Sequence, residues 1–520
     1  MKHLTTGLTA LSRAAQLCLL AAAFGTSAGV AAADTTRVIV AFKPGVTAQA
    51  RAAIEAARGA VRLELPAQHA VAVELPAAAV AALRRQAHFA YVEEDVRRYP
   101  LALTSPSKTP YLHGQRVPYG IAMVQADQLP DTQAANRKLC IIDSGIDRAH
   151  EDLRTVPADG IHDTGTGWWN TDENAHGTHV AGTIAALNNA GTGVVGVAPN
   201  GRLKLHIVKV FSADGWAYSS TLAKAAQQCG DAGAHVISMS LGGGLPSQTE
   251  IRTFQALALK GVLSVAAAGN NGNSAVSYPA GYPSVMMVGA VDEHRQWAGF
   301  SQFNHQMELA APGVEVLSTV PMRSGSEPAL TVARVTYSPG SMSGSPQRSA
   351  SGALADFGLG DKVNPAVAGK VCLIARGNID FATKVGNCQN SGGVGAVVYN
   401  NVAGGFGGTL GAAVTVIPSV TASDTEGARL KTQLGQAATV TVTPVHYAYF
   451  DGTSMATPHV AAVAALVWSY FPRCSASQIR ASLNKSALDL GSAGWDDKFG
   501  HGLVQAKAAH DRIAAKGCGI

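Results

Sequence analysis

The segment Gly452-Thr453-Ser454-Met455-Ala456-Thr457-Pro458-His459-Val460 places a serine at the start of an apolar stretch. Residues 460–467 are valine, alanine and leucine, which predicts that the segment continues as a buried helix. A hydroxyl at the start of a helix lies beside unpaired backbone N–H groups. Such donors stabilise the oxyanion of an acyl-transfer reaction, so Ser454 is a candidate nucleophile that needs a base and an orienting acid.

Two other segments supply these groups. Asp143 follows the apolar pair Ile141-Ile142, which predicts a buried strand ending at a carboxylate. His176 stands where a second apolar helix is expected to begin. The chain order is therefore Asp, His, Ser. We expect Ser454 to attack, His176 to take and return its proton, and Asp143 to hold the imidazole and stabilise the imidazolium.

Two alternatives apply to these residues. His176 and His179 could bind a metal, but the zinc-protease helix carries His-Glu-x-x-His with a glutamate base, and this segment does not. The chain could also be a binding protein that keeps the fold of such an enzyme without its activity, although the expected catalytic residue types are all present.

These motifs together resemble those of the subtilases, the subtilisin-like serine proteases of peptidase family S8, from about residue 111 onward with one interruption. The resemblance implies an α/β fold with a doubly wound, mostly parallel sheet. It also implies an endopeptidase that hydrolyses proteins through an acyl-enzyme, with His176 rather than His179 as the base. The segment Ala266-Ala267-Ala268-Gly269-Asn270 resembles the oxyanion-hole segment of the family, so Asn270 is expected to donate its amide to the oxyanion.

The resemblance extends to the substrate-binding residues. Residues Ser240, Leu241 and Gly242 resemble the strand that pairs with an extended peptide, a contact that does not select side chains. With Ala267, Ala268 and Gly269 they would form the walls of the pocket for the residue before the scissile bond. Because these walls are small and apolar, and Asn271 stands where an acid could favour basic residues, we expect broad cleavage after apolar or aromatic residues.

One loop resembles the high-affinity calcium loop of the family. Calcium prefers six to eight oxygen ligands, including carboxylates and backbone carbonyls. The alternative for this segment is an ordinary polar turn. The ligands that the resemblance implies are Gln115, Asp152, Leu187, Asn189, Thr192 and Val194.

The N-terminal residues 1–33 predict a secretory signal peptide. Lys2 and Arg13 precede an apolar stretch over residues 14–24, and small residues follow up to Ala33. We therefore expect Sec-type export to the extracellular medium. No later apolar run has the length of a membrane span, so no membrane anchor is expected.

Residues 34–100 predict a separate α+β unit. Strands are expected at 37–42, 70–75 and 91–95, with helices at 47–58 and 77–86. This pattern resembles the inhibitor I9-type propeptide of the subtilases, which implies a self-processed zymogen whose propeptide is both folding aid and intramolecular inhibitor. The alternative is a permanent N-terminal domain. Residues 101–114, rich in Ser, Thr and Pro, predict an exposed linker where processing occurs.

The catalytic domain is expected in two parts, residues 115–322 and 446–520. The interruption, residues 323–445, contains segments 370–377 and 392–400 that resemble the protease-associated (PA) domain, a small β-rich module. We expect this insert to restrict or recruit protein substrates. An accessory lobe with no kinetic role is the alternative.

The cysteine count favours disulfides. Cys18 lies in the predicted signal peptide, and an even number remains in a chain expected to be exported, although 15 pairings are possible. Cys372–Cys388 is the local choice, and Cys474–Cys518 would tie the C-terminal tail to the end of the Ser454 helix. Cys140–Cys229 then remains. The alternative is free, buried thiols.

Composition limits the partners. The chain is 47% hydrophobic and 14% charged with 56 glycines, which suits a compact globular protein. Its net charge of +5 forms no basic stripe interleaved with aromatic residues, so no nucleic acid is expected. We expect a monomer that acts on protein or peptide substrates.

Overall fold

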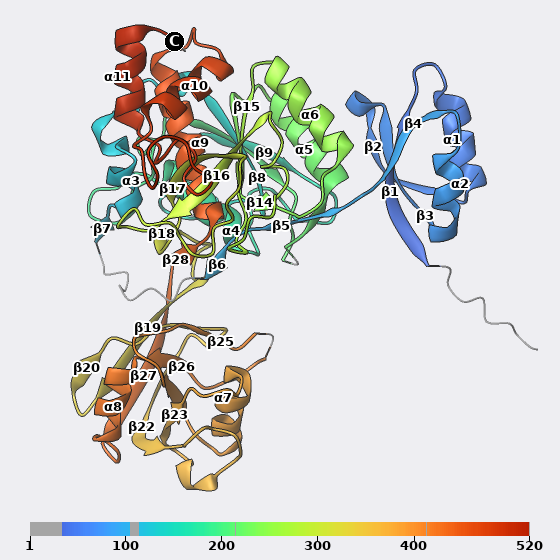
Figure 1. The fold of residues 1–520 in the computed structure, drawn as a ribbon. Helices are drawn as coiled ribbons and strands as arrows, with labels where there is room; N and C mark the ends of the chain where they lie inside the picture. Colours follow the sequence, from blue (N-terminus) through green and yellow to red (C-terminus); the bar gives the residue numbers. More distant parts are fainter. Residues whose placement is uncertain (1–33, 105–113, 214, 412, 519–520) are drawn as a thin grey trace, which may run out of the picture.

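The computed structural model describes residues 34–104, 114–213, 215–411 and 413–518 (Figure 1). The predicted signal peptide lies outside these ranges, as do residues 105–113 of the predicted linker. Within them, no helix has the length and hydropathy needed to cross a membrane.

The central unit is built on a seven-stranded parallel sheet with the order β17-β16-β15-β13-β8-β11-β9. β8 comes first in the chain and has later strands on both sides, so the winding direction reverses beside it. The doubly wound parallel sheet expected from the sequence is therefore confirmed. The strands are β8 (Lys138–Asp143), β9 (Ala158–His162), β11 (Lys204–Lys209), β13 (Val236–Met239), β15 (Leu263–Ala267), β16 (Val285–Val291) and β17 (Met307–Pro312).

Helices cover both faces of this sheet (Figure 1). Successive residues of β8 face different cores. Ile141 packs with the helices of one face and Ile142 with those of the other, as a strand between two helical layers requires. The first face carries α4 (His176–Ala185) and α9 (Thr453–Tyr470), and the second carries α5 (Ser219–Asp231) and α6 (Gln248–Leu259).

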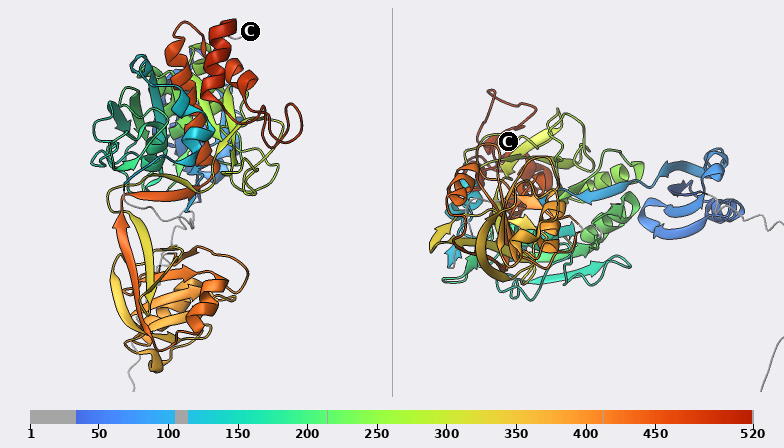
Figure 2. Two further views of the ribbon diagram at one scale, coloured as in Figure 1. Left: turned by 90° about the vertical axis from the view of Figure 1, so that its left-hand side faces the viewer. Right: turned by 90° about the horizontal axis from the view of Figure 1, so that it is seen from below.

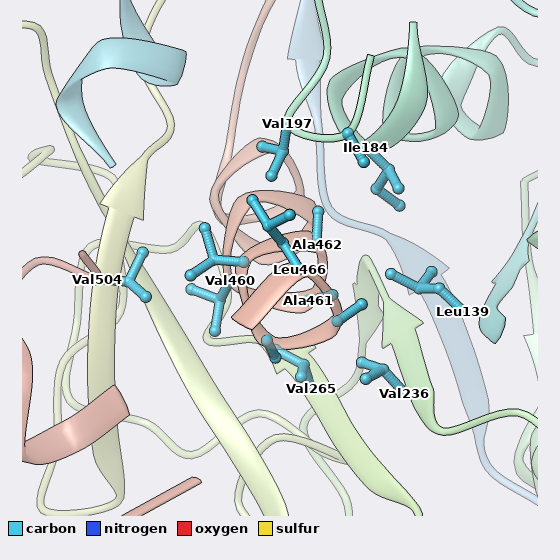
Figure 3. Packing of buried hydrophobic residues seen from close by; sticks show 14 of the residues in the cluster. Leu139, Ile184, Val197, Val236, Val265, Val460, Ala461, Ala462, Leu466 and Val504 are labelled. Atoms are coloured by element: carbon cyan, nitrogen blue, oxygen red, sulfur yellow. The ribbon is translucent and has the colours of Figure 1, made fainter. Parts of the chain in front are cut away.

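Helix α9 lies in the middle of the larger core. Its Val460, Ala461 and Leu466 pack with Val236 and Val265 of the sheet (Figure 3). The helix is apolar on all sides, which is typical of a helix that is buried along its length. Helices α10 (Ala476–Ser486) and α11 (Ala506–Lys516) follow it and pack against it.

Residues 34–101 are here called the N-terminal unit. Residues 35–94 of this unit form a four-stranded antiparallel sheet with its helices, in the strand order β2-β3-β1-β4. Strand β2 was not predicted, because it lies at the sheet edge and is mostly exposed, so its residues carry little hydrophobic pattern. The expected helix at 77–86 is a 3₁₀ turn followed by the short α2. The elements are β1 (Thr35–Phe42), α1 (Thr47–Ala56), β2 (Ala60–Leu65), β3 (Ala70–Pro76), α2 (Val80–Arg84) and β4 (Phe89–Glu94).

The insert is a body apart from the central unit (Figure 2). β19 (Gly325–Val332) leaves and β27 (Ala437–Val445) returns as its antiparallel partner, with Gly325 opposite Val445. The sheet order is β20-β19-β27-β22-β23-β24-β26. The other elements of this sheet and its helices are β20 (Val335–Tyr337), β22 (Ser349–Asp356), β23 (Val371–Ala375), α7 (Phe381–Asn390), β24 (Gly395–Tyr399), β26 (Ser419–Ala422) and α8 (Asp424–Lys431). The short strands β21 (Met342–Ser343) and β25 (Gly408–Thr409) form a separate parallel pair.

The described ranges contain three disulfides, in the predicted pairs. Cys140–Cys229 joins β8 to α5, and Cys372–Cys388 joins β23 to α7 inside the insert. Cys474–Cys518 ties the residues after α9 to the tail after α11.

Two histidines are buried in the core beside the helices. His179 of α4 donates from Nε2, which lies 3.0 Å from the Val316 carbonyl oxygen and 3.1 Å from that of Ala448. His459 of α9 donates from Nδ1 to the Met455 carbonyl at 2.7 Å. Carbonyl acceptors require N–H donors, and burial lowers the pKa of His179 to about 3 and that of His459 to about 4. Both rings are therefore neutral in the folded protein.

Because these two buried histidines are neutral in the folded protein, we predict that acid lowers the free energy of unfolding. In the unfolded chain both rings protonate near pH 6.5. Between that pH and about pH 4 the unfolded state binds more protons, so the free energy of unfolding falls as the pH falls, by about 1.4 kcal/mol per unit for each histidine. The measurement is urea denaturation of Ser454→Ala from pH 7 to 4. Adding His459→Gln should remove one histidine's share of the slope, and an unchanged slope would contradict the prediction.

Candidate active site

Asp143 and His176 meet at the carboxyl edge of the sheet. β8 ends at Asp143 and α4 begins at His176, whose Nδ1 lies 2.7 Å and 2.9 Å from the two carboxylate oxygens. Both side chains are buried. Because a carboxylate only accepts, Nδ1 carries the ring proton and Nε2 is the acceptor of the neutral ring. In the described part of the chain Nε2 has no hydrogen-bond partner, which leaves it available to take a proton.

Asp172 holds the loop before His176 and was missed by the sequence analysis. One of its oxygens accepts from the Ser144 hydroxyl at 2.8 Å and from the Ala175 N–H at 3.0 Å. The other accepts from the Thr178 N–H at 2.8 Å and its hydroxyl at 2.6 Å. Burial raises the pKa of this carboxyl, and the hydrogen bonds oppose that rise. In the sequence Asp172 belongs to an ordinary polar loop, with no local signal of its role.

The start of α9 is fixed by Asn270, which follows β15. The side-chain oxygen of Asn270 accepts from the Thr453 N–H at 2.9 Å and from its hydroxyl at 2.8 Å. This orients the Asn270 amide nitrogen toward the cleft. Gly452 has φ of 150°, and a Cβ there would lie 3.0 Å from that nitrogen, so the close approach requires glycine.

Ser454 is buried, and its hydroxyl donates to the Ser240 carbonyl at 2.8 Å. The Ser240 hydroxyl in turn donates to the Ser454 carbonyl at 2.8 Å. No hydrogen bond joins Ser454 to His176, although both residues lie in the described ranges. The structure thus brings Asp143 to His176, and Ser454 to Asn270 and Ser240.

The carbonyl oxygen of Leu101 is bound by Asn270, the predicted oxyanion-hole residue, and by the backbone N–H of Ser454. It accepts from Asn270 Nδ2 at 2.7 Å and from the Ser454 N–H at 3.2 Å. The Leu101 N–H donates to the Ser240 carbonyl at 3.2 Å. Leu101 and Ala102 are half-buried, so the prediction of an exposed linker from residue 101 was wrong for its first two residues. Their backbone docks on strand edges that no local pattern reveals.

The chain on either side of Leu101 is extended and paired. Before it, β5 (Arg97–Pro100) lies between β12 (Ala217–Tyr218) and β14 (Leu241–Gly242) as the middle strand of an antiparallel sheet. After it, β6 (Leu103–Thr104) pairs with β28 (Tyr447–Asp451). The Leu101–Ala102 bond therefore lies between two paired segments, in the pose of an extended peptide.

The pocket beside Leu101 is small-walled on one side. A Cβ on Gly242 would lie 2.9 Å from Leu101 Cδ1, so the absence of a side chain at Gly242 makes room for the leucine. Ser240 and Leu241 contact this segment through their backbone, whereas Ala267 and Ala268 are fully buried. A pocket of about 920 Å³ here is also lined by Asn271, which the sequence singled out, and by Ala275 and Gln302.

Most of the predicted calcium ligands lie near one another. Asp152 is fully buried and accepts from Asn189 Nδ2 at 2.8 Å and from the Val194 N–H at 2.9 Å. β7 (Gln115–Arg116) pairs with β10 (Gly193–Val194), and the Gln115 amide nitrogen is buried with no partner in the described part of the chain. The Leu187 N–H donates to the Asp152 carbonyl at 3.0 Å, and that of Thr192 donates to the Asn189 carbonyl at 3.1 Å.

The chemistry of this donor set suits a hard cation. In the ranges that the structure describes, no group of three or more His, Cys, Asp and Glu side chains could hold a metal. A cation here would therefore rely on amide and carbonyl oxygens around the single carboxylate of Asp152, a combination that calcium accepts. The zinc alternative gains no support, because His176 and His179 engage different partners.

Comparisons with known proteins agree with this geometry. The subtilase family matches residues 134–355 and 337–502. Subtilisin DY of Bacillus licheniformis is 43% identical over 213 residues, which are 40% of this chain and 76% of that protein. The psychrophilic subtilisin-like protease Apa1 of Pseudoalteromonas sp. AS-11 is 42% identical, with a TM-score of 0.58 over 78% of this chain and 100% of the other.

Fervidolysin from Fervidobacterium pennivorans, a keratinolytic enzyme related to subtilisin, shares the fold at 24% identity. Its TM-score is 0.60, over 92% of this chain and 61% of fervidolysin. The family match and the subtilisin relatives establish the class of the protein. The chain belongs to the subtilase family and is a subtilisin-like serine endopeptidase.

Proposed function

We propose that the chain is an exported zymogen that cleaves itself between Leu101 and Ala102, and then hydrolyses other proteins at the same site. The observation that carries this proposal is the Leu101 carbonyl, which accepts from the Ser454 N–H and from Asn270 Nδ2. Donors in that position stabilise the charge that develops on a carbonyl oxygen during nucleophilic attack. Leu101 is thus the residue before the scissile bond.

The residues act in the order that their contacts allow. The Ser454 hydroxyl leaves the Ser240 carbonyl, gives its proton to His176 Nε2 and attacks the Leu101 carbonyl carbon. Asn270 and the Ser454 N–H hold the oxyanion, while Asp143 stabilises the imidazolium. The Leu101–Ala102 bond then breaks, His176 gives its proton to the leaving amine of Ala102, and water hydrolyses the acyl-enzyme.

The N-terminal unit acts in this scheme as an I9-type propeptide, both folding aid and inhibitor. Glu93 accepts from the Ser247 hydroxyl at 3.0 Å and from the Thr249 N–H at 3.0 Å, at the start of α6. Asp95 accepts from the Ser220 N–H at 2.9 Å and its hydroxyl at 2.6 Å, at the start of α5. Carboxylates are favourable at helix N-termini, so these contacts stabilise two helices of the catalytic unit.

The substrates proposed for the mature enzyme are proteins and peptides with an apolar or aromatic residue before the scissile bond. Leu101 itself is apolar and fits against Gly242. Export is supported by the predicted signal peptide and by the three disulfides, which persist in oxidising compartments. We propose that the mature enzyme acts as an extracellular monomer.

The insert is proposed to be a PA domain that restricts or recruits protein substrates. Its returning strand β27 leads within two residues into β28, which pairs with the segment after the scissile bond. The insert is therefore anchored on the side of the cleft where the leaving part of a substrate lies. A folded protein would meet it there, whereas a short peptide would not.

A structural calcium ion is proposed at the loop that follows α4. Asp152, Asn189 and Gln115 would supply side-chain oxygens, and Leu187, Thr192 and Val194 would supply carbonyls. The Asp152 carboxylate is fully buried and accepts from neutral donors, the Asn189 amide and the Val194 N–H, which supports a cation at this position. The ion would contribute stability rather than chemistry.

The first prediction of this proposal concerns self-processing. The wild type should yield a mature chain that begins at Ala102 and reacts with a serine-directed fluorophosphonate. Ser454→Ala should remain full-length and unlabelled, because no nucleophile is left. N-terminal sequencing and gel labelling are the measurements, with Ser492→Ala, an exposed serine, as the control. Processing of Ser454→Ala at Ala102 would show that another enzyme cuts there. A mature N-terminus within residues 105–113 would refute cleavage of the Leu101–Ala102 bond.

The second prediction concerns the insert. Deleting residues 325–444 joins Ser324 to Val445. Because Gly325 is the register partner of the retained Val445, the new ends lie close together and the catalytic fold should persist. We expect kcat/KM for a short peptide to be retained and that for a folded protein to change by about tenfold, equivalent to about 1.4 kcal/mol of barrier. Unchanged rates on both substrates would refute the role.

The third prediction concerns calcium. Chelation should lower the Tm of Ser454→Ala, because a ligand at about 100 times its Kd adds about 2.7 kcal/mol to folded-state stability. Asp152→Asn should abolish the response to chelator, and Gln115→Leu should weaken it with less disturbance of the core. Asp361→Asn, an exposed carboxylate in the insert, is the control. If chelation lowered the Tm of Asp152→Asn as much as that of the parent Ser454→Ala, the ion would bind elsewhere.

A further inference from the structure

We propose that Glu250 makes the active-site cleft selective for substrates with arginine at the position of Arg98. That position lies three residues before the residue whose carbonyl is attacked. This inference rests on the proposed cleavage between Leu101 and Ala102, which places Arg98 at that substrate position. In the usual notation Leu101 is P1 and Arg98 is P4. The subsite that holds Arg98 is here called the Glu250 pocket, and consists of Glu250, Tyr282, Gly243 and the Leu245 carbonyl.

The guanidinium of Arg98 is fully enclosed in this pocket. Its Nε donates to Glu250 Oε1 at 3.0 Å and one terminal nitrogen donates to Oε2 at 2.8 Å, a two-pronged contact with the carboxylate. The same nitrogen also donates to the Leu245 carbonyl at 2.9 Å. The Arg98 side chain is 1% exposed and that of Glu250 is 0% exposed.

The pocket is shaped for this group on the enzyme side. The Tyr282 hydroxyl donates to Glu250 Oε2 at 2.8 Å and so orients the carboxylate. A Cβ at Gly243 would lie 3.0 Å from the near terminal nitrogen of Arg98, so glycine allows the guanidinium to approach. Glu250 stands in the first turn of α6, where the helix N-terminus favours a negative charge.

Release of the N-terminal unit leaves the carboxylate without a counter-ion. In the described part of the chain the one salt bridge of Glu250 is with Arg98, which departs with the released unit. A substrate with arginine at P4 restores the pair, whereas a neutral residue leaves a buried charge unpaired. Lysine cannot reproduce the planar, two-pronged contact, so the pocket distinguishes arginine from lysine.

The competing interpretation is that the pair only holds the N-terminal unit in place. Backbone pairing of β5 with β12 and β14 argues against a role limited to docking, because the same strand edges would receive any extended substrate. A substrate in that pose carries its own fourth residue into the Glu250 pocket. Selection then operates on every substrate, not on the N-terminal unit alone.

The test uses mature enzyme and internally quenched peptides of sequence X-Tyr-Pro-Leu-Ala-Leu, with X as Arg, Lys, Gln or Leu. We expect kcat/KM for Arg to exceed that for Gln by about tenfold or more, with Lys between them. In Glu250→Gln the Arg and Gln peptides should be cleaved at similar rates. Asp231→Asn, an exposed acid at the end of α5, should keep the wild-type preference.

Maturation of Glu250→Gln can fail because Arg98 would then be buried without its partner. The double variant Arg98→Gln/Glu250→Gln removes both charges and yields the same mature enzyme. Equal rates on the Arg and Gln peptides for the wild type would overturn the proposal, as would a preference that survives in the double variant. If no peptide is cut between Leu and Ala, the proposed function itself fails, which is a different result.

Discussion

The burial of helix α9 along its length is the constraint on which the site depends. Residues Thr453 through Ser469 are all buried, so the helix cannot slide or tilt without opening the core. Its first turn is tied to Asn270 through Thr453, at the edge where the parallel strands end. Ligands of doubly wound sheets bind outside that edge, beside the strand where the winding reverses. Packing of the helix and these two hydrogen bonds therefore set where Ser454 and its backbone N–H lie.

Carboxylates at helix starts are the recurring polar element of the structure. Asp172 serves α4, Asp95 serves α5 and Glu93 serves α6, each through backbone N–H groups and hydroxyls. Two of these three come from the N-terminal unit, which therefore adds a carboxylate at the starts of α5 and α6. If that unit is a propeptide, its help in folding has a physical basis, since helix starts are costly to nucleate.

The periodicity of apolar residues in single segments predicted the strands and helices that carry the candidate catalytic residues. Asp143 ends an apolar run and His176 and Ser454 begin apolar helices, so the sheet edge could be assembled from strand and helix periodicity. The docking of Leu101, the role of Asp172 and the Arg98–Glu250 pair could not. The last joins residues 152 positions apart, and each is an ordinary polar residue in its own segment. Polar contacts between distant segments leave no period in the sequence.

The paired ends of the insert have a consequence for the history of such chains. Gly325 and Val445 face each other as register partners, as the ends of a hairpin do. The insert therefore connects two points of the catalytic chain that lie no farther apart than the ends of a tight turn. A domain joined in this way can be gained, lost or exchanged without moving β18 (Val316–Thr319) or β28. The same catalytic core could therefore be fitted with different modules at this point while the cleft itself stays the same.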